Sequence, residues 1–230
     1  MLLEQAHACC VSAAVPENSP QVSETIKASG SVRRCLEWDQ PFLLVRAFSD
    51  HCRWMDVYSY SEPSPDDPNM GLPGRHEYNA GTRHYWGDME SEERFGVEPA
   101  SFGLILVPFV FEHVSRPWDA IRTVARSLEP GGFVIWSAPM FQQYHGSPHD
   151  YYRYTPKGVR ALAAHGGLEV EKIYAPGDLA LVSGVMMGMM LPYWTRDQAL
   201  SETEPEPGDD SPRHPLNVFA LLRKPIAPAA

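Results

Sequence analysis

The sequence predicts an α/β fold, a three-layer sandwich on a Rossmann-like, mainly parallel sheet. The first observation is a strand, a helix and a strand within residues 103–138, a βαβ unit whose crossover makes the two strands parallel. The second is a further helix and strand over 155–174 in the same alternation. Hydrophobic residues make up 43% of the 230 positions and charged residues 21%, which excludes a wholly disordered chain.

The βαβ unit begins with an uninterrupted apolar run over 103–111, typical of a strand that is buried on both faces. Pro117 begins the helix, and Pro130-Gly131-Gly132 ends it. The second strand is predicted over 133–138. One helix face is expected to be buried because its apolar residues recur at steps of three and four: Trp118, Ile121, Val124, Ala125 and Leu128.

The next helix has clear end signals. Thr155 is the expected N-cap, and Pro156 occupies the first helical position, where its missing N–H costs nothing. Gly166 is the expected C-cap. Strands are predicted at 168–174 and 217–223, and the inward-facing residues of the helix are Val159, Leu162 and Ala163.

The first half of the chain has a weaker pattern. Short strands are predicted at 33–38 and 53–57, and a long turn-rich loop at 61–82. We expect residues 1–30 to form an N-terminal arm, 31–225 the domain and 226–230 a tail. Within the domain, 176–216 is expected to be an insertion or lid that ends in an acidic, proline-broken loop.

Charge and cysteine content limit the function classes. The net charge of −10 disfavours nucleic-acid binding, which needs a basic surface. The longest apolar run, 179–194, is too short to span a bilayer, and no secretory leader is expected. A soluble, cytoplasmic protein with reduced, mostly buried thiols is predicted, because the four cysteines show neither a disulfide framework nor metal-ligand spacing: Cys9, Cys10, Cys35 and Cys52.

Candidate functional residues follow two of the predicted strands. Ligands of open parallel sheets bind beyond the carboxyl ends of the strands, and Glu112-His113 ends the strand at 103–111. The loop at 140–154 follows the next strand and holds two histidines, an aspartate and an arginine among five aromatic residues. This density favours a functional loop.

A purely structural interpretation stays open for each feature. Glu112 and His113 could cap or pair near the following helix, and Asp150 could pair with Arg153 to fix the loop. Metal binding by His145 and His149 lacks further ligands at suitable spacing, so no metal site is expected.

Several segments together resemble the class I S-adenosylmethionine-dependent methyltransferases, in particular the type 11 methyltransferase domains. The resemblance runs from Gly87 to about Ala175, with a weaker similarity at 216–225. It implies a seven-stranded sheet with an antiparallel C-terminal strand at 217–223. The matching segments, in the order of the family, are Asp88, 101–105, 112–114, 126–132 and 147–155.

The resemblance also implies a cofactor site for S-adenosylmethionine. Asp88 and Met89 would lie near the adenine, and Val107 and Pro108 would line the methionine side. Asp56 is the candidate acceptor for the ribose hydroxyls. One more cofactor candidate is the residue 19 positions before Asp56, at the end of the first strand, Glu37.

The chain departs from the family after this first strand. The family has a glycine-rich turn there, which lets the backbone approach the cofactor, whereas here Trp38-Asp39-Gln40-Pro41 follows. Trp38 and Pro41 would occupy the space of the amino-acid end of the cofactor. Either the loop runs differently or the affinity for the cofactor is reduced or lost.

Two hypotheses from different classes follow. The first is a methyltransferase for a small molecule, such as a sugar, a lipid-linked acceptor or a secondary metabolite, with His113 or His149 as the base. Residues 179–194 would then form a lid, or else a helix packed into the core. The second is a cofactor-less binding or assembly module, with homo-oligomer or partner contact through 179–194. In the first hypothesis the acceptor would contact Tyr144, His145, Tyr152 and Arg153.

A nicotinamide oxidoreductase is disfavoured, because it would need a glycine-rich turn of the same kind.

Overall fold

The computed structural model describes residues 20–28, 32–38, 52–59, 83–146, 149–177, 179–188 and 214–226. Its centre is an open seven-stranded sheet in the order β3-β2-β1-β4-β5-β7-β6. Strand β7 is antiparallel to both of its neighbours, and the other pairs are parallel. The predicted α/β class, with a mainly parallel sheet and an antiparallel C-terminal strand, is therefore confirmed. The strands are β1 Val32–Trp38, β2 Cys52–Ser59, β3 His84–Trp86, β4 Phe102–Pro108, β5 Leu128–Pro139, β6 Glu169–Tyr174 and β7 Asn217–Arg223.

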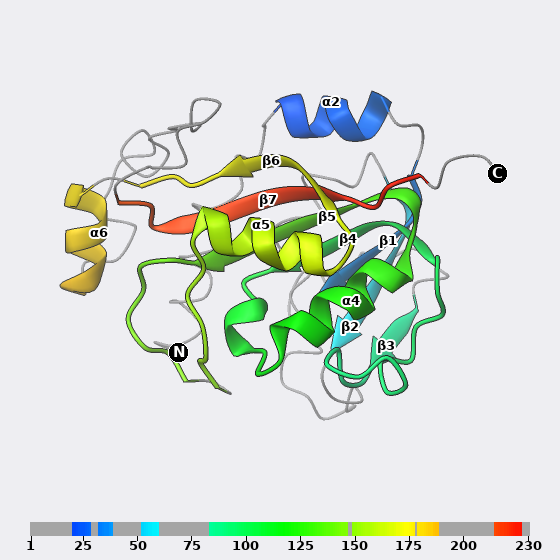
Figure 1. Ribbon diagram of the computed structural model, residues 1–230, viewed down its shortest axis with the longest axis horizontal. Helices are drawn as coiled ribbons and strands as arrows, with labels where there is room; N and C mark the ends of the chain where they lie inside the picture. The colour runs from blue at the N-terminus through cyan, green and yellow to red at the C-terminus, as the bar shows by residue number, and fades with distance from the viewer. Residues whose placement is uncertain are drawn as a thin grey trace.

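Helices cover the strands in layers. Helices α4 and α5 lie side by side, and in Figure 1 strands β6 and β7 run between this pair and α2. Helix α6 lies beyond the end of the sheet, close to the start of β7. The helices are α2 Pro20–Ala28, the short 3₁₀ helix η2 Phe111–His113, α4 Pro117–Ser127, α5 Pro156–His165 and α6 Leu179–Met186.

The βαβ unit of β4, α4 and β5 follows the prediction, but two boundaries differ, and Trp118, predicted on the buried face of the helix, is 47% exposed. Strand β4 ends at Pro108, because Phe109 takes a φ of +51° and turns the chain into η2. Helix α4 ends at Ser127, and β5 begins at once with Leu128. A proline restricts the residue before it to extended conformations, so Pro130 prevents the helix from continuing.

The capping signals of α5 are confirmed. The Thr155 side chain accepts a hydrogen bond from the Gly158 N–H at 3.0 Å, which satisfies one of the free donors at the helix start. Pro156 is the first helical residue, and Gly166 is the C-cap.

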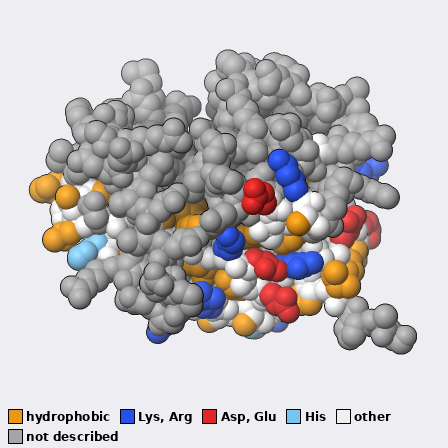
Figure 2. Space-filling model, turned by 90° about the horizontal axis from the view of Figure 1, so that it is seen from above, with side chains coloured by type: hydrophobic (Ala, Val, Ile, Leu, Met, Phe, Trp, Pro, Cys, Tyr) orange, Lys and Arg blue, Asp and Glu red, His pale blue; other side chains and the backbone are white. Residues whose placement is uncertain are grey.

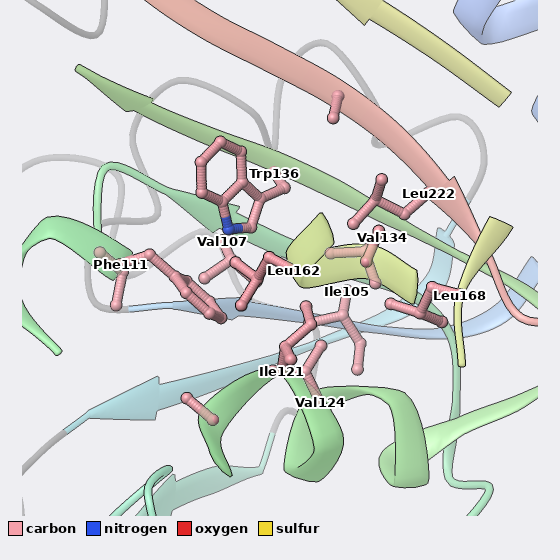
Figure 3. Close-up of a cluster of buried hydrophobic side chains, with 14 of the residues drawn as sticks. Ile105, Val107, Phe111, Ile121, Val124, Val134, Trp136, Leu162, Leu168 and Leu222 are labelled. Atoms are coloured by element: carbon pink, nitrogen blue, oxygen red, sulfur yellow. The ribbon is translucent and has the colours of Figure 1, made fainter. Parts of the chain in front are cut away.

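The hydrophobic core lies between the sheet and the helices α4 and α5. In Figure 3, Ile121 and Val124 of α4 reach toward Ile105 and Val107 of β4. Trp136 of β5 lies on the same face, with its ring 5.8 Å from that of Phe111. This packing fixes η2 directly beyond the end of β4.

The expectation of reduced thiols is wrong for two of the four cysteines. Cys35 of β1 and Cys52 of β2 form a disulfide with a Cα–Cα distance of 5.8 Å. The rule based on cysteine density failed because the contact arises from the pairing of two parallel strands, which the sequence spacing does not reveal. Cys9 and Cys10 lie outside the described residues. Among the described helices, none is both long and apolar enough to cross a membrane.

Removing the disulfide should destabilise the fold. The disulfide joins two residues 17 positions apart in the sequence. Loop-closure entropy predicts that the double variant Cys35→Ala/Cys52→Ala loses about 3 kcal/mol of its free energy of unfolding. Urea unfolding with and without a thiol reductant measures this, and the reductant should leave the double variant unchanged. Equal stability of the oxidised wild type and the double variant would contradict a structural disulfide.

Candidate active site

The carboxyl ends of β4 and β5 meet at one edge of the sheet, and each is followed by a candidate segment. Strand β4 leads into η2, and β5 leads into the loop of residues 140–155. The carbonyl oxygen of Glu112 accepts hydrogen bonds from the N–H groups of Tyr151 at 2.7 Å and Tyr152 at 3.3 Å. The buried hydroxyl of Tyr154 donates to the carbonyl oxygen of Phe111 at 3.0 Å. The loop is therefore fixed against η2.

This docking brings together Glu112, His113 and His145. The Oε1 atom of Glu112 lies 3.9 Å from Nε2 of His113 and 3.9 Å from Nε2 of His145. The two imidazole rings are 4.9 Å apart and nearly perpendicular. We call these three residues the Glu112 cluster.

Glu112 is the most deeply buried member, with 1% of its side chain exposed. Burial raises the pKa of its carboxyl group to about 8, because the charged form is poorly solvated there. Among the described residues, Oε2 of Glu112 has no hydrogen-bond partner. A buried polar atom without a partner is rare in proteins and calls for an explanation.

The Nδ1 atoms of both imidazoles point away from Glu112 and toward acceptors. Nδ1 of His113 contacts the carbonyl oxygen of His149, and Nδ1 of His145 lies 3.4 Å from Oδ2 of Asp150. Burial lowers the pKa of His145, so its neutral form is favoured. In both rings, Nε2 is the atom that faces the carboxylate.

Asp150 and Arg153 form the clasp that the sequence left open as a structural alternative. The guanidinium donates to both oxygens of Asp150 and to the carbonyl oxygen of Gln143 at 3.1 Å. Burial alone would raise the pKa of Asp150, but the hydrogen bonds from Arg153 and from the His145 N–H lower it to about 2. The clasp sets the position of His145.

The other residues predicted to contact the acceptor are more exposed than the Glu112 cluster. Tyr144 is 79% exposed, and Tyr152 is 41% exposed and donates its hydroxyl proton to the carbonyl oxygen of Ser115. The imidazole of His149 is also exposed. The structure thus brings His113 and His145 together and leaves Tyr144 and His149 at the surface. The sequence prediction did not pair Glu112 with His145, since 33 residues separate them along the chain.

Glu37 lies next to the last residue of β1. Its side chain is 1% exposed, and neither carboxylate oxygen has a hydrogen-bond partner among the described residues. Burial raises its pKa well above the usual range. A cationic ligand at this edge would supply the missing partner.

Asp56 does not end its strand as predicted. It lies inside β2, three residues before Ser59, and is fully buried. Its Oδ2 atom forms an ion pair with Nε of Arg34 at 2.7 Å, and its Oδ1 atom accepts from the Arg83 N–H at 2.9 Å. Its carboxylate is therefore held within the sheet.

The segment after β3 is also internally bonded. Asp88 accepts from the Glu90 N–H at 2.8 Å and from Arg94 at 2.6 Å, so its carboxylate closes a turn. Met89 is fully buried in the core. Val107 and Pro108 end β4 and are buried.

Trp38 belongs to the core. Its ring stacks on Tyr58 of β2 at 4.0 Å and lies 5.9 Å from Phe95. The hydroxyl of Tyr58 donates to the carbonyl oxygen of Phe95 at 3.0 Å. The indole, 1% exposed, therefore packs between β1, β2 and the segment after β3. Pro41 lies outside the described residues.

Residues 76–136 match the family model described as "Methyltransferase domain". The predicted resemblance to this family is confirmed. The architecture agrees with it, since a seven-stranded sheet with an antiparallel β7 is the arrangement that the resemblance implied. No curated protein sequence matches the chain.

Solved structures support the same fold at low sequence identity. A methyltransferase from Mesorhizobium loti, described as S-adenosylmethionine dependent, is 14% identical over 92% of this chain and 100% of its own, with a TM-score of 0.58. A chain of the complex between the Haloferax volcanii Trm112 methyltransferase activator and a methyltransferase is 15% identical over 91% and 90%, with a TM-score of 0.58. The N-methyltransferase NodS from Bradyrhizobium japonicum is 14% identical over 90% and 93%, with a TM-score of 0.53.

Helix α6 lies beside the candidate site. The side chain of Gln143 donates to the carbonyl oxygen of Met186 at 2.9 Å, and Leu181 and Val182 pack near Phe141. Exposed apolar side chains gather over this end of the molecule, at the left of Figure 2: Leu179, Met186 and Met187.

The variant Glu37→Gln should be more stable than the wild type, and the gain should grow with pH. The raised pKa keeps a proton on folded Glu37 at pH values where the unfolded chain has lost it. The free energy of unfolding of the wild type therefore falls as pH rises above about 4.5, and glutamine removes this fall. Urea unfolding between about pH 5 and about pH 8 measures the difference.

The matched control for this measurement is Glu171→Gln, on the exposed side of β6, where the carboxylate pairs with Arg223. This pair is solvent-exposed, so we expect a change of about 1 kcal/mol or less. Parallel pH profiles of wild type and Glu37→Gln would contradict a neutral buried Glu37.

Proposed function

We propose that the chain is an S-adenosylmethionine-dependent methyltransferase that acts on a small molecule with a hydroxyl group, such as a sugar, a lipid-linked acceptor or a secondary metabolite. The observation that carries the proposal is the buried carboxylate of Glu37, which has no hydrogen-bond partner among the described residues. It lies at the carboxyl edge of a sheet with the methyltransferase topology, where open α/β sheets bind their ligands.

The residues at this edge fit one end of the cofactor. S-Adenosylmethionine supplies, when bound, a methyl group on a positively charged sulfur, and its amino-acid end carries an ammonium group. Glu37 would accept hydrogen bonds from that ammonium, which gives the buried carboxylate a cationic partner. Val107 and Pro108 would form the apolar wall beside it. The carboxylates of Asp56 and Asp88 already have partners within the chain, so binding of the nucleoside end by these two residues would require them to share or exchange these partners.

The Glu112 cluster would act on the acceptor. Methyl transfer to a hydroxyl group needs a proton acceptor, whereas in-line placement of the two reactants supplies much of the remaining acceleration. Neutral imidazole suits this task near neutral pH. The cluster lies beyond the carboxyl end of β4, and we propose that it takes up the acceptor proton.

The alternative is a cofactor-less module that binds a partner. The observation that favours it is the exposed apolar surface of α6, where Leu179 is 60% exposed and Met187 is 73% exposed. Surfaces of this kind often contact other proteins. The neighbour that forms a complex with the Trm112 activator is consistent with partner contact at some surface of this fold.

Calorimetric titration with S-adenosylmethionine and with its demethylated product tests the proposal. We expect both to bind, and we expect Glu37→Gln to weaken binding by about ten- to a hundredfold, the effect of losing one charged hydrogen bond. Glu171→Gln should leave the affinity unchanged.

Failure of the wild type to bind either compound at millimolar concentration would rule out the methyltransferase. Stable oligomers or complexes seen by light scattering in that case would favour the alternative.

A further inference from the structure

We propose that the Glu112 cluster is a binding site for a divalent transition-metal ion of the Zn²⁺ type, held by one carboxylate oxygen and two imidazole nitrogens. The candidate ligand atoms of Glu112, His113 and His145 all lie within 4.8 Å of one another. The binding itself does not depend on the proposed function.

The distances fit a metal ion with little movement. Zn–N and Zn–O bonds of about 2.0–2.2 Å place two ligands of a tetrahedral site about 3.4 Å apart. The observed separations from Glu112 Oε1 to the two Nε2 atoms are 3.9 Å each. A contraction of about half an ångström, within the reach of small side-chain rotations, would close the site around an ion.

Within the described part of the chain, no lysine or arginine forms an ion pair with the Glu112 carboxylate. The ion pairs of Glu112 are with His113 and His145. The nearby Arg153, whose charge acts on Glu112 from a distance, is bonded to Asp150. Glu112 is 1% exposed, and its Oε2 atom lacks a hydrogen-bond partner among the described residues. Buried charges in proteins are normally paired or coordinate a metal ion.

The outer contacts of the two imidazoles match those of metal ligands. A metal-bound histidine usually donates its second N–H to a backbone carbonyl or a carboxylate, which fixes the ring and its tautomer. His113 directs Nδ1 to the carbonyl oxygen of His149, and His145 directs Nδ1 toward Asp150. Both Nε2 atoms are thereby left facing Glu112, on the side where an ion would lie.

Three protein ligands leave at least one position open, as in catalytic zinc sites. This extension rests on the proposed function: the hydroxyl oxygen of the acceptor would occupy the open position and lose its proton more easily there, because a metal ion lowers the pKa of a bound oxygen. With both Nε2 atoms bonded to the ion, the proton would pass to Oε2 of Glu112, the carboxylate oxygen that the ion leaves free. Two nitrogens and one oxygen suit Zn²⁺ or Co²⁺ better than Mg²⁺, which prefers oxygen ligands.

The test is a titration of metal-free, full-length protein with Co²⁺, in the absence of S-adenosylmethionine. We expect one equivalent to bind with the visible absorption of four- or five-coordinate Co²⁺, Zn²⁺ to displace it, and Mg²⁺ to have no effect. Glu112→Gln, His113→Asn and His145→Asn should each weaken binding by at least about a hundredfold, more than the loss of an outer-shell partner. His165→Asn, at the end of α5, is the matched control and should bind as the wild type does.

Circular dichroism and thermal unfolding show which variants fold. If Glu112→Gln does not fold, either histidine variant is enough to test the proposal. Zn²⁺ should also raise the melting temperature of the wild type and of His165→Asn only. The proposal is overturned if folded ligand variants bind as tightly as the wild type or if the spectrum shows octahedral Co²⁺. It is also overturned if a thiolate charge-transfer band shows that Cys9 and Cys10 hold the metal. Because the readout is metal binding, loss of the proposed methyltransferase function would not alter it.

Discussion

The burial of the Glu112 carboxylate is the constraint on which the candidate site depends. Its backbone carbonyl anchors the loop after β5 through two N–H groups, and its side chain is enclosed as a result. The same docking delivers His145 to the carboxylate from a different strand. A carboxylate enclosed in this way is costly unless a proton or a cation accompanies it, so the chemistry of the site follows from how Glu112 is neutralised.

The arrangement also separates two acidic groups by environment. Asp150 is held ionised by Arg153 with a pKa of about 2, whereas burial raises the pKa of Glu112 to about 8. Asp150 therefore acts as the fixed negative charge that orients His145. Glu112 is the group whose charge can change when a ligand arrives.

The sequence predicted the fold well where local signals were strong. Thr155, Pro156 and Gly166 marked α5 correctly, and the apolar run of β7 was predicted at its observed bounds. Strand β3 has only three residues, His84–Trp86, too few to show an alternating pattern. Asp56 was placed at a strand end because β2 was predicted two residues short, and the register of β1 with β2 puts it opposite Leu36, inside the sheet.

The site was predicted only in part, because its geometry depends on contacts between distant segments. The rule that ligands bind at the carboxyl ends of strands pointed to His113 and His145 separately. Their meeting at Glu112 requires the fold of the loop, which the Asp150–Arg153 clasp and the Tyr154 hydroxyl determine. Likewise, Trp38 in the sequence suggested an obstacle to the cofactor, whereas its stacking on Tyr58 makes it a core residue. Trp38, which replaces the start of the family's glycine-rich turn, is thus accommodated within the methyltransferase topology.

The most direct test of the account is a crystal structure of the protein with Zn²⁺ and the demethylated cofactor product, with anomalous data at the zinc edge. We expect an anomalous peak bonded to Glu112, His113 and His145, and the product at the carboxyl edge with its ammonium group on Glu37. An empty Glu112 cluster together with no product at Glu37 would contradict it.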